Sequence, residues 1–401
     1  MTALSVEEGR SKQNGDIEVL RAFAVGGVMV HHFNVLLLNV VLPASWAALP
    51  GPFNFSGGVD LFFAISGFVI ARSLLPQLSA ATSADAKRRT ILAFWTKRAF
   101  RLWPSAWLWL ALILAATAAY AFSNPQLSFE TNLKWTVAGV LNVANFRYGL
   151  TFGREPAGAS FHYWSLSLEE QFYFLLPLLA LWWRRRTYIL LLILIAIDVL
   201  RPPTYLTVST RVAGLLLGVL IAQWSARGSY AGVAKWFGAL NGVVAFALCV
   251  CGALLVAFAS GLPGAFPMKW AMVAAASGAT VLLASFDSNA LWIGRSWRAF
   301  SSWMGSRSYA LYLIHVPVYL MLNDVFSAQF GWTSVERPRL CLAAIALGAS
   351  LTAALAELNY RFVETPLRAR GQRVAARLKA RSQPPTNDGV SLVPNRDPSA
   401  S

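Results

Sequence analysis

The sequence predicts an all-α protein, a bundle of about ten helices that cross a membrane with both termini in the cytoplasm. The chain is 56% hydrophobic and 13% charged over 401 residues, which is too apolar for a soluble domain. Apolar segments of about twenty residues recur along it, the length that a helix needs to cross about 30 Å of hydrocarbon. Basic residues cluster in alternate loops, and the positive-inside rule then places both ends in the cytoplasm.

The predicted spans divide the chain into three parts: a cytoplasmic N-terminal segment, 1–19, a membrane domain, 20–360, and a cytoplasmic tail, 361–401. The expected spans are 20–42, 57–76, 101–122, 164–183, 187–201, 206–226, 236–260, 268–286, 303–326 and 339–358. The polar start of the chain lacks the pattern of a cleavable signal, so we expect the first span to be retained. The tail is first basic and surface-associated, and its end is rich in Pro, Ser and Asn, which predicts disorder.

The net charge of +16 raises the possibility of a nucleic-acid partner, but its distribution argues against one. Basic groups lie before alternate spans, and the intervening segment 43–56 carries no charge. We therefore interpret the charge as a topology signal. The three cysteines, Cys249, Cys251 and Cys341, lie in apolar segments without ligand spacing, so we expect inert thiols and no metal.

Ionisable side chains inside spans are costly, so each is a candidate functional group. In LRAFAVGGVMVHHFNVLLL, Arg21 and His32 are eleven residues apart, which places them on the same helix face about 16 Å apart along the axis. We expect Arg21 at the cytoplasmic end and His32 near mid-membrane. An imidazole at that depth serves either as a base or as a bridge between helices, and the residues alone do not separate the two.

The second span holds Asp60 near its outer end and Arg72 near the opposite end. The glycines before Asp60 permit close helix approach. Asp60 either caps a helix end, orients a nearby histidine or binds an acceptor hydroxyl. Arg72 is a candidate partner for a carboxylate or phosphate.

Two arginines precede the third span in FWTKRAFRLWPSAW. Arg98 and Arg101 are three residues apart and therefore share a helix face. Such a run is often only a topology signal or a contact with lipid phosphates. If the pair faces a cavity, it predicts a site for a phosphorylated cytoplasmic ligand.

The fourth span enters from the outer face and carries Glu169 and Glu170 behind His162 and Ser165. Adjacent helical residues point about 100° apart, so we expect the two carboxylates to serve different tasks. Their predicted place is the outer side of the bundle, with the arginines inside and His32 between. Either proton handling or binding of a sugar hydroxyl suits them.

His315 lies midway along the ninth span, two residues before Pro317. Proline in a helix frees a backbone carbonyl and kinks the helix. We expect a structural role for His315, in which it satisfies that freed polarity.

These motifs together resemble the acyltransferase-3 family of integral membrane acyltransferases. The matching pieces are Arg21 with ten residues before His32, GGVDLFFAISGFVIA, KRAFRLWP, HYWSLSLEEQFYFLLP, SYALYLIHVPV and NYRFVETPLR, in family order. The resemblance implies a membrane O-acyltransferase of the bacterial cytoplasmic (inner) membrane. It would move an acyl group, usually acetyl from acetyl-CoA, onto a saccharide hydroxyl. Family acceptors include lipopolysaccharide, exopolysaccharide, peptidoglycan and oligosaccharide signals, and only about forty residues follow the last span, so we expect the stand-alone form.

The resemblance also implies roles for individual residues. The nucleotide end of acyl-CoA is polyanionic and cytoplasmic, so we expect it to bind at Arg98 and Arg101, with Arg21 as a further candidate. The resemblance carries the family's arginines over to these three positions, makes His32 the catalytic histidine and marks acidic sites. Those acidic sites are Asp60, Glu169 and Glu170. His32 would either deprotonate the acceptor hydroxyl or be acylated and relay the group, and the sequence leaves both routes open.

Three other functions compete with acyl transfer. A transporter or flippase also uses intramembrane His, Asp and Glu as a proton relay, but no internal repeat is visible. A lipid-linked glycosyltransferase needs a larger acidic outer loop than 123–163, whose acids are Glu130 and Glu155. A structural or receptor role does not explain so many intramembrane charges.

Overall fold

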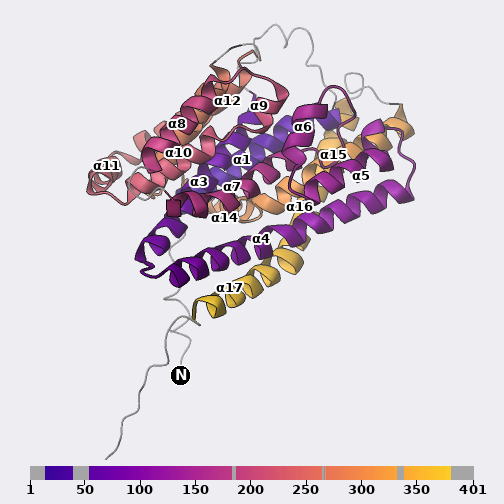
Figure 1. Cartoon of the computed structure of the whole chain (residues 1–401). Coiled ribbons are helices and arrows are strands. Elements are labelled where there is room, and N and C mark those ends of the chain that lie inside the picture. The colour runs from indigo at the N-terminus through magenta and orange to yellow at the C-terminus, as the bar shows by residue number, and fades with distance from the viewer. Residues whose placement is uncertain are drawn as a thin grey trace, which may run out of the picture.

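A computed structural model of the chain describes residues 14–38, 54–182, 187–263, 266, 268–331 and 338–380. In this part every extended regular element is a helix, and no strand is present, which confirms the all-α prediction. Figure 1 shows the helices as one bundle, with the long α4 and the C-terminal α17 running side by side along one edge.

The first half of the chain builds one side of the site. Its elements are α1 (Gly15–His32), the π-helix η2 (Phe33–Leu38), η3 (Phe55–Gly57), α3 (Gly58–Ala80), α4 (Ala84–Ala119), η4 (Pro125–Leu127), α5 (Phe129–Val140), α6 (Ala144–Thr151) and α7 (Tyr163–Trp182). Asn14 caps α1 by accepting a hydrogen bond from the backbone of Ile17, and Ser83 caps α4 by accepting one from Ala86. Local sequence signals thus fix where these two helices begin.

The second half surrounds α3 and returns to the site. Its elements are α8 (Thr187–Leu200), α9 (Tyr205–Ser209), α10 (Ala213–Ser225), α11 (Gly228–Gly238), α12 (Gly242–Gly261), α13 (Lys269–Ser285), α14 (Gly294–Ser306), α15 (Ser308–Phe330), α16 (Pro338–Asn359), the π-helix η6 (Tyr360–Glu364) and α17 (Thr365–Ala380). Helix α15 packs on both α1 and α16, so a residue midway along α15 comes close to the end of α1.

Seven helical segments of the described residues are long and apolar enough to cross a membrane. They are Gly15–Leu36, Phe55–Ala80, Ala84–Ala119, Tyr205–Ser225, Gly242–Gly261, Ser308–Phe330 and Leu342–Ala380. Two shorter apolar helices, Tyr188–Leu200 and Lys269–Ser285, coincide with the fifth and eighth expected spans. Helix α7 is not among the seven; Glu169, Glu170 and Gln171 interrupt its apolar sequence. Each expected span therefore overlaps helix in the described residues, and seven segments are candidate membrane spans, while the number of ten spans stays a prediction.

Several helix ends differ from the expected ones. Helix α4 begins at Ala84 rather than 101, because Ser83 caps it and the basic residues that follow are good helix formers. Its 36 residues span about 54 Å, which exceeds the hydrocarbon thickness of a bilayer. The expected span 206–226 is split near Thr210 into α9 and α10, and the span expected from 303 begins at Ser308, after a break at Arg307.

Glycines bring three of the central helices into close contact. A Cβ atom on Gly67 of α3 would lie 2.0 Å from the Leu215 carbonyl oxygen, and one on Gly218 of α10 would lie 2.2 Å from the Ala64 oxygen. A Cβ on Gly58 would lie 2.6 Å from the Ala24 oxygen of α1. Small residues let helix backbones approach in this way, as expected for the glycines before Asp60.

The basic segment after the last span is an ordered helix. Helix α16 passes through the five-residue π-helix η6 into α17, which packs along the first half of α4. A Cβ on Gly371 would lie 2.5 Å from the Phe100 Cβ, so the two helices touch closely. No break separates the membrane domain from the tail at 360, and the segment 381–401, where disorder was expected, lies outside the described residues.

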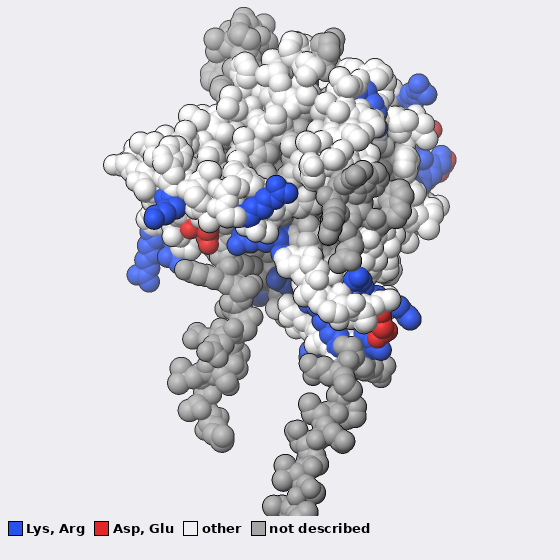
Figure 2. All heavy atoms as spheres, turned by 60° about the vertical axis from the view of Figure 1, so that its left-hand side comes forward, with Lys and Arg blue, Asp and Glu red and all other residues white. Residues whose placement is uncertain are grey.

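The face drawn in Figure 2 is mostly uncharged. Its Lys and Arg side chains gather mainly in the lower half, with a smaller group high on the right. This unequal distribution over the surface agrees with the alternation of basic loops along the sequence.

Candidate functional site

A pocket enclosed by α1, α3, α4, α7 and α15 collects most of the charged side chains that the sequence analysis selected. The space there that no protein atom fills is about 720 Å³, part of which is open to solvent. We call it the arginine pocket, and its polar lining consists of Arg21, Ser66, Arg98, Arg101, Ser165, Glu169, Tyr173, Ser308, Tyr309 and Tyr312. The sequence analysis had placed the arginines and the glutamates on opposite sides of the bundle, and the structure shows that this was wrong for Glu169.

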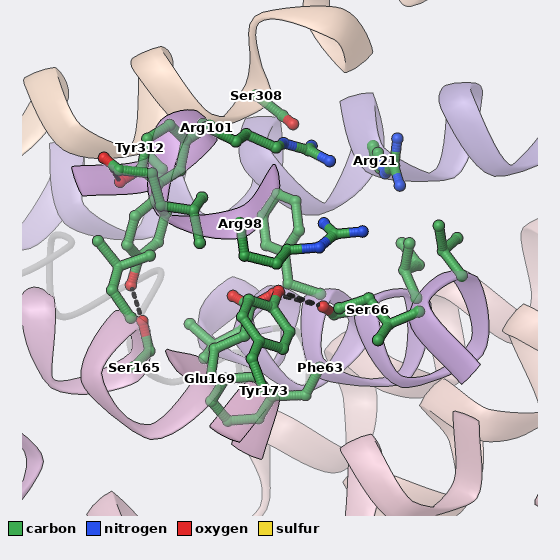
Figure 3. Close-up of a pocket in the computed structure, with 18 residues that line it drawn as sticks. Arg21, Phe63, Ser66, Arg98, Arg101, Ser165, Glu169, Tyr173, Ser308 and Tyr312 are labelled. Atoms are coloured by element: carbon green, nitrogen blue, oxygen red, sulfur yellow. Dashed lines mark hydrogen bonds between the residues drawn. The ribbon is translucent and has the colours of Figure 1, made fainter. Parts of the chain in front are cut away.

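Arg98 and Arg101 bring two positive charges to the pocket, which Glu169 also lines. Among the described residues, neither guanidinium forms an ion pair or a hydrogen bond. The Arg98 guanidinium carbon instead lies 5.5 Å from the centre of the Tyr173 ring. Arg21 differs, because its Nη1 lies 2.5 Å from Glu18 Oε1. In Figure 3 the Arg98 and Arg101 side chains extend in the same direction, toward the side where Arg21 lies.

Glu169 is the carboxylate that faces this pocket. Ser66 and Tyr173 both donate hydrogen bonds to its Oε1, and the Ser66 and Tyr173 hydroxyl oxygens lie 2.7 Å apart (Figure 3). Tyr173 is four residues after Glu169 on α7, which puts both on one helix face. Glu169 therefore lies near the arginines because both groups point inward from the middle of their helices.

Glu170 points elsewhere. Its Oε2 accepts a hydrogen bond of 2.7 Å from the Trp103 indole, and it lines a different hollow beside α4. The prediction that the two adjacent carboxylates serve different tasks agrees with this geometry. Their separation follows from the rotation of about 100° between neighbouring helical residues.

His32 ends α1 and is hydrogen-bonded to a second histidine. Its Nδ1 lies 2.8 Å from Nε2 of His315, and the two ring planes are inclined by 22°. Nδ1 of His315 lies 3.1 Å from the backbone oxygen of Leu311. The π-helix η2 starts directly after His32, and such turns are frequent at functional sites.

The structure corrects the role expected for His315. The carbonyl that Pro317 leaves without its helical donor is that of Leu313, four residues earlier. His315 binds the Leu311 carbonyl instead, and its other nitrogen meets His32. The side chain thus contacts His32 and the Leu311 carbonyl, and the carbonyl that the kink frees is a different one.

A layer of side chains separates the arginine pocket from the histidines. The hydroxyl oxygens of Ser165 and Tyr312 lie 2.7 Å apart, and both residues line the pocket. The Tyr312 ring lies 5.5 Å from the His315 ring and 5.4 Å from that of the fully buried His162. His162 in turn lies 5.4 Å from His315, and His31 lies 5.4 Å from His32, so ring contacts link all four histidines here.

Aromatic residues cover the histidines from the side of α6. The Phe161 ring lies edge-on to His32, with a centroid distance of 5.6 Å, and it neighbours Tyr148 and Phe152. Tyr148 lies outside the candidate spans, and burial raises its pKa to about 12. It therefore remains a neutral donor or acceptor at physiological pH.

Asp60 is brought to an arginine that the sequence analysis did not select. Its two carboxylate oxygens accept hydrogen bonds of 2.7 and 2.8 Å from Arg211, whose guanidinium carbon lies 4.2 Å from the centre of the Trp270 ring. Both oxygens are used by this buried pair, and none of the described contacts of His32 is with Asp60. Only the lone charge of Arg211 within an apolar segment signalled it in the sequence.

Arg72 lies outside the arginine pocket. Its guanidinium sits over the Phe68 ring at 5.6 Å, and it borders a separate hollow together with Lys87 and Arg227. The sequence analysis also missed Ser66, Tyr173 and Tyr312. Uncharged hydroxyls in an apolar helix carry no distinctive signal, although the four-residue spacing of Glu169 and Tyr173 was visible.

No three-residue group of His, Cys, Asp and Glu in the described chain is arranged to hold a metal ion. Cys249 and Cys251 are free thiols on α12, and Cys249 is buried. The site is therefore described by its histidines, arginines and carboxylates.

Comparisons with known proteins identify the family. The model of an acyltransferase domain matches residues 14–356. The O-acetyltransferase OatA of Staphylococcus aureus (strain MRSA252) is 28% identical over 92% of this chain and 59% of its own length. The peptidoglycan O-acetyltransferase OatA of Listeria monocytogenes is 28% identical, over 88% and 56% respectively.

The chain thus spans less than two thirds of the length of these relatives. No solved structure matches it. The family match covers α1 through most of α16, which is the part that carries the arginine pocket and the paired histidines. With that match, the chain belongs to the acyltransferase-3 family, as its sequence motifs predicted.

Proposed function

We propose that this protein is an O-acetyltransferase of the bacterial cytoplasmic membrane. In this proposal it moves an acetyl group from cytoplasmic acetyl-CoA to a hydroxyl of a cell-envelope saccharide, and the acceptor is a peptidoglycan sugar. The observation that carries the proposal is a pair of unpaired arginines, Arg98 and Arg101, in a pocket one side-chain layer from the His32–His315 pair. The names of the relatives support the acetyl group and the peptidoglycan acceptor.

The arginine pocket fits the phosphate end of an acyl-CoA. Guanidinium groups bind phosphate oxygens in pairs of hydrogen bonds, and among the described residues neither of these two guanidiniums forms a hydrogen bond that a phosphate would have to displace. The thioester of the bound donor would supply the activated acyl carbon. For that carbon to reach His32, the Ser165–Tyr312 layer has to open.

His32 then acts as the base. Its ring nitrogen that does not face His315 takes the proton of the acceptor hydroxyl while the hydroxyl oxygen bonds to the acyl carbon. The carbon–sulfur bond breaks as this intermediate collapses, and the thiolate takes the same proton from the imidazolium. Atoms and charge balance without a further reactant.

The remaining polar groups support binding. Glu169 is held by Ser66 and Tyr173 near the arginines, so in this proposal it orients the donor site rather than the imidazole. The aromatic rings of Phe161, Tyr148 and Phe152 offer apolar faces next to His32 on which an acceptor sugar can pack.

Transfer of label in a reconstituted system tests the function. The purified protein in nanodiscs is incubated with [14C]acetyl-CoA and a muramyl-containing oligosaccharide, and esterified label is counted. We expect label on the sugar with the wild type and none with His32→Ala. A folded His32→Ala protein with normal activity would overturn the assignment of the base. If neither protein transfers label, and proteoliposomes instead move a solute or lipid, the protein is a transporter or flippase.

Two further measurements distinguish direct transfer from an acyl-histidine relay and identify the acceptor. Rapid quenching without acceptor traps an acetylated His32 if the group is relayed, and we expect none in direct transfer. Mass spectrometry of the envelope glycans of a deletion strain should show an acetyl mass lost from peptidoglycan. A loss from lipopolysaccharide or exopolysaccharide instead would refute the proposed acceptor.

A further inference from the structure

His315 and His32 form a hydrogen-bonded pair whose proton positions follow from the geometry. The two histidines are 283 residues apart in the chain, and packing of α1 on α15 brings them together. His32 Nδ1 and His315 Nε2 are 2.8 Å apart, while the ring centroids are 5.0 Å apart and the planes are inclined by 22°. Nitrogens at this distance share one hydrogen.

The nitrogen of His315 that does not face His32 shows where the proton of the His315 ring lies. Nδ1 of His315 lies 3.1 Å from the carbonyl oxygen of Leu311, four residues earlier on α15. A carbonyl oxygen only accepts hydrogen bonds, so Nδ1 must be the protonated nitrogen of His315.

The charge state of His315 shows which histidine supplies the hydrogen between the two rings. The residue is fully buried, and the rings around it belong to His32, His162, Tyr312 and Tyr319. Its described contacts include no carboxylate that would compensate a positive charge, so the ring is neutral. A neutral imidazole with a protonated Nδ1 has a lone pair on Nε2, and that lone pair can only accept.

The hydrogen between the rings must therefore come from His32. His32 carries its proton on Nδ1, donates it to His315, and has a lone pair on Nε2. We infer that His315 is a positioning residue that holds His32 in the Nδ1–H tautomer, with Nε2 free to act as the base. This inference rests on the proposed function for its consequence, although the tautomer itself does not depend on it.

The pair also stabilises the charge that catalysis creates. When Nε2 of His32 takes a proton, the ring becomes an imidazolium and its Nδ1–H becomes a stronger donor to His315. A histidine does this without placing a carboxylate charge in the apolar interior, which would be costly at rest.

Nitrogen NMR of the wild-type protein tests the tautomer without any assay of activity. The protein labelled with 15N-histidine is studied in nanodiscs, and His31→Gln, His32→Gln and His162→Gln spectra assign the signals. We expect His32 to show a protonated Nδ1 and an unprotonated Nε2, and His315 likewise. A protonated Nε2 on His32 in the wild type would overturn the inference, whatever the activity.

Substitution of His315 tests its consequence for turnover. His315→Phe keeps a ring but offers no acceptor, and we expect kcat to fall by about 100-fold with KM for acetyl-CoA changed by less than about twofold. His315→Gln places an oxygen as many bonds from Cβ as Nε2 is, and we expect it to recover at least about tenfold of that loss. Arg89→Ala, at a pair with Asp85 away from the histidines, is the control.

The NMR measurement and the kinetics of the His315 variants also distinguish a failure of this inference from a failure of the proposed function. If the NMR tautomer is as stated and no acyl transfer occurs in the wild type, the proposed function fails and the pairing stands. If transfer occurs and folded His315→Phe retains full kcat, the positioning role is refuted while the proposed function survives. Thermal unfolding of each variant shows whether a loss of activity is only a loss of fold.

Discussion

At the scale of single residues, the pairing of a charge decides what it can do. Arg98 on α4 and Arg211 between α9 and α10 both point into the bundle, but Arg211 gives its donors to Asp60 and to the Val208 carbonyl. Arg98 has no such partner among the described residues, and its charge is available to a ligand. An arginine that is paired with a carboxylate holds helices together, whereas an arginine without such a pair can bind a ligand.

Loss of both unpaired arginines should weaken donor binding. We expect Arg98→Ala with Arg101→Ala to raise KM for acetyl-CoA by at least about 30-fold, because each charge-assisted contact to phosphate contributes roughly 1.5 to 3 kcal/mol. The measurement is initial-rate kinetics over both substrates. Arg89→Ala is the matched control, since Arg89 lies on the same helix, is half-buried and pairs with Asp85 outside the pocket. An unchanged KM for acetyl-CoA with a raised KM for the acceptor would show that the arginine pocket is not the donor site.

Removal of the Asp60 charge should act on stability. Asp60→Asn leaves Arg211 as a buried charge without its partner, which typically costs about 3 to 5 kcal/mol. We expect a lower midpoint of thermal unfolding in detergent. Asp85→Asn, which breaks an exposed pair on α4, should change the midpoint little. Equal midpoints for Asp60→Asn and the wild type would argue against a structural pair.

At the scale of helices, close backbone contact holds the centre of the bundle. Helix α3 carries Asp60 and Ser66, and α10 packs against it through Gly67 and Gly218. Because the backbones nearly touch, neither helix can shift without the other. The position of Ser66 beside Glu169 therefore depends on α10, which does not itself line the arginine pocket.

A bulky residue in this contact should disrupt the bundle. Gly218→Leu cannot be placed, since even its Cβ would lie 2.2 Å from the Ala64 oxygen, and we expect aggregation on size-exclusion chromatography. Gly232→Leu on α11 is the control, because a Cβ there meets nothing within 4 Å. A monodisperse Gly218→Leu protein with full activity would show that the helices tolerate separation.

At the scale of the whole molecule, the bundle has two unlike ends. Helix α4 is longer than a bilayer is thick, and its first half is accompanied by the basic helix α17. We expect this end to project into the cytoplasm, with the arginine pocket opening toward it.

Cysteine accessibility tests this orientation. In a background without native cysteines, Thr82→Cys lies before α4 and Ser123→Cys lies after it, and both positions are exposed. We expect an impermeant maleimide to label Ser123→Cys in intact cells, and Thr82→Cys only after the cells are permeabilised. The reverse pattern would invert the topology and place the donor site on the wrong side of the membrane.

The sequence by itself determined the class of the protein and most of its elements. Apolar length and helix caps act over a few residues, so the helices and the inward charges such as Arg98, Glu169 and His32 were visible in the chain. Family motifs added the chemistry. The predicted helix ends were wrong where a local cap such as Ser83 or a break such as Arg307 set the end of the helix in place of the apolar pattern.

Only the tertiary structure decided which charge meets which. The Asp60–Arg211 pair joins residues 151 apart, and His32–His315 joins residues 283 apart. Glu169 proved to face the arginines and not the histidines. Spacing along one helix determines which residues share a face, but the partner of that face depends on how helices pack. That packing was set by contacts such as Gly67 against Leu215, which link segments far apart in the chain.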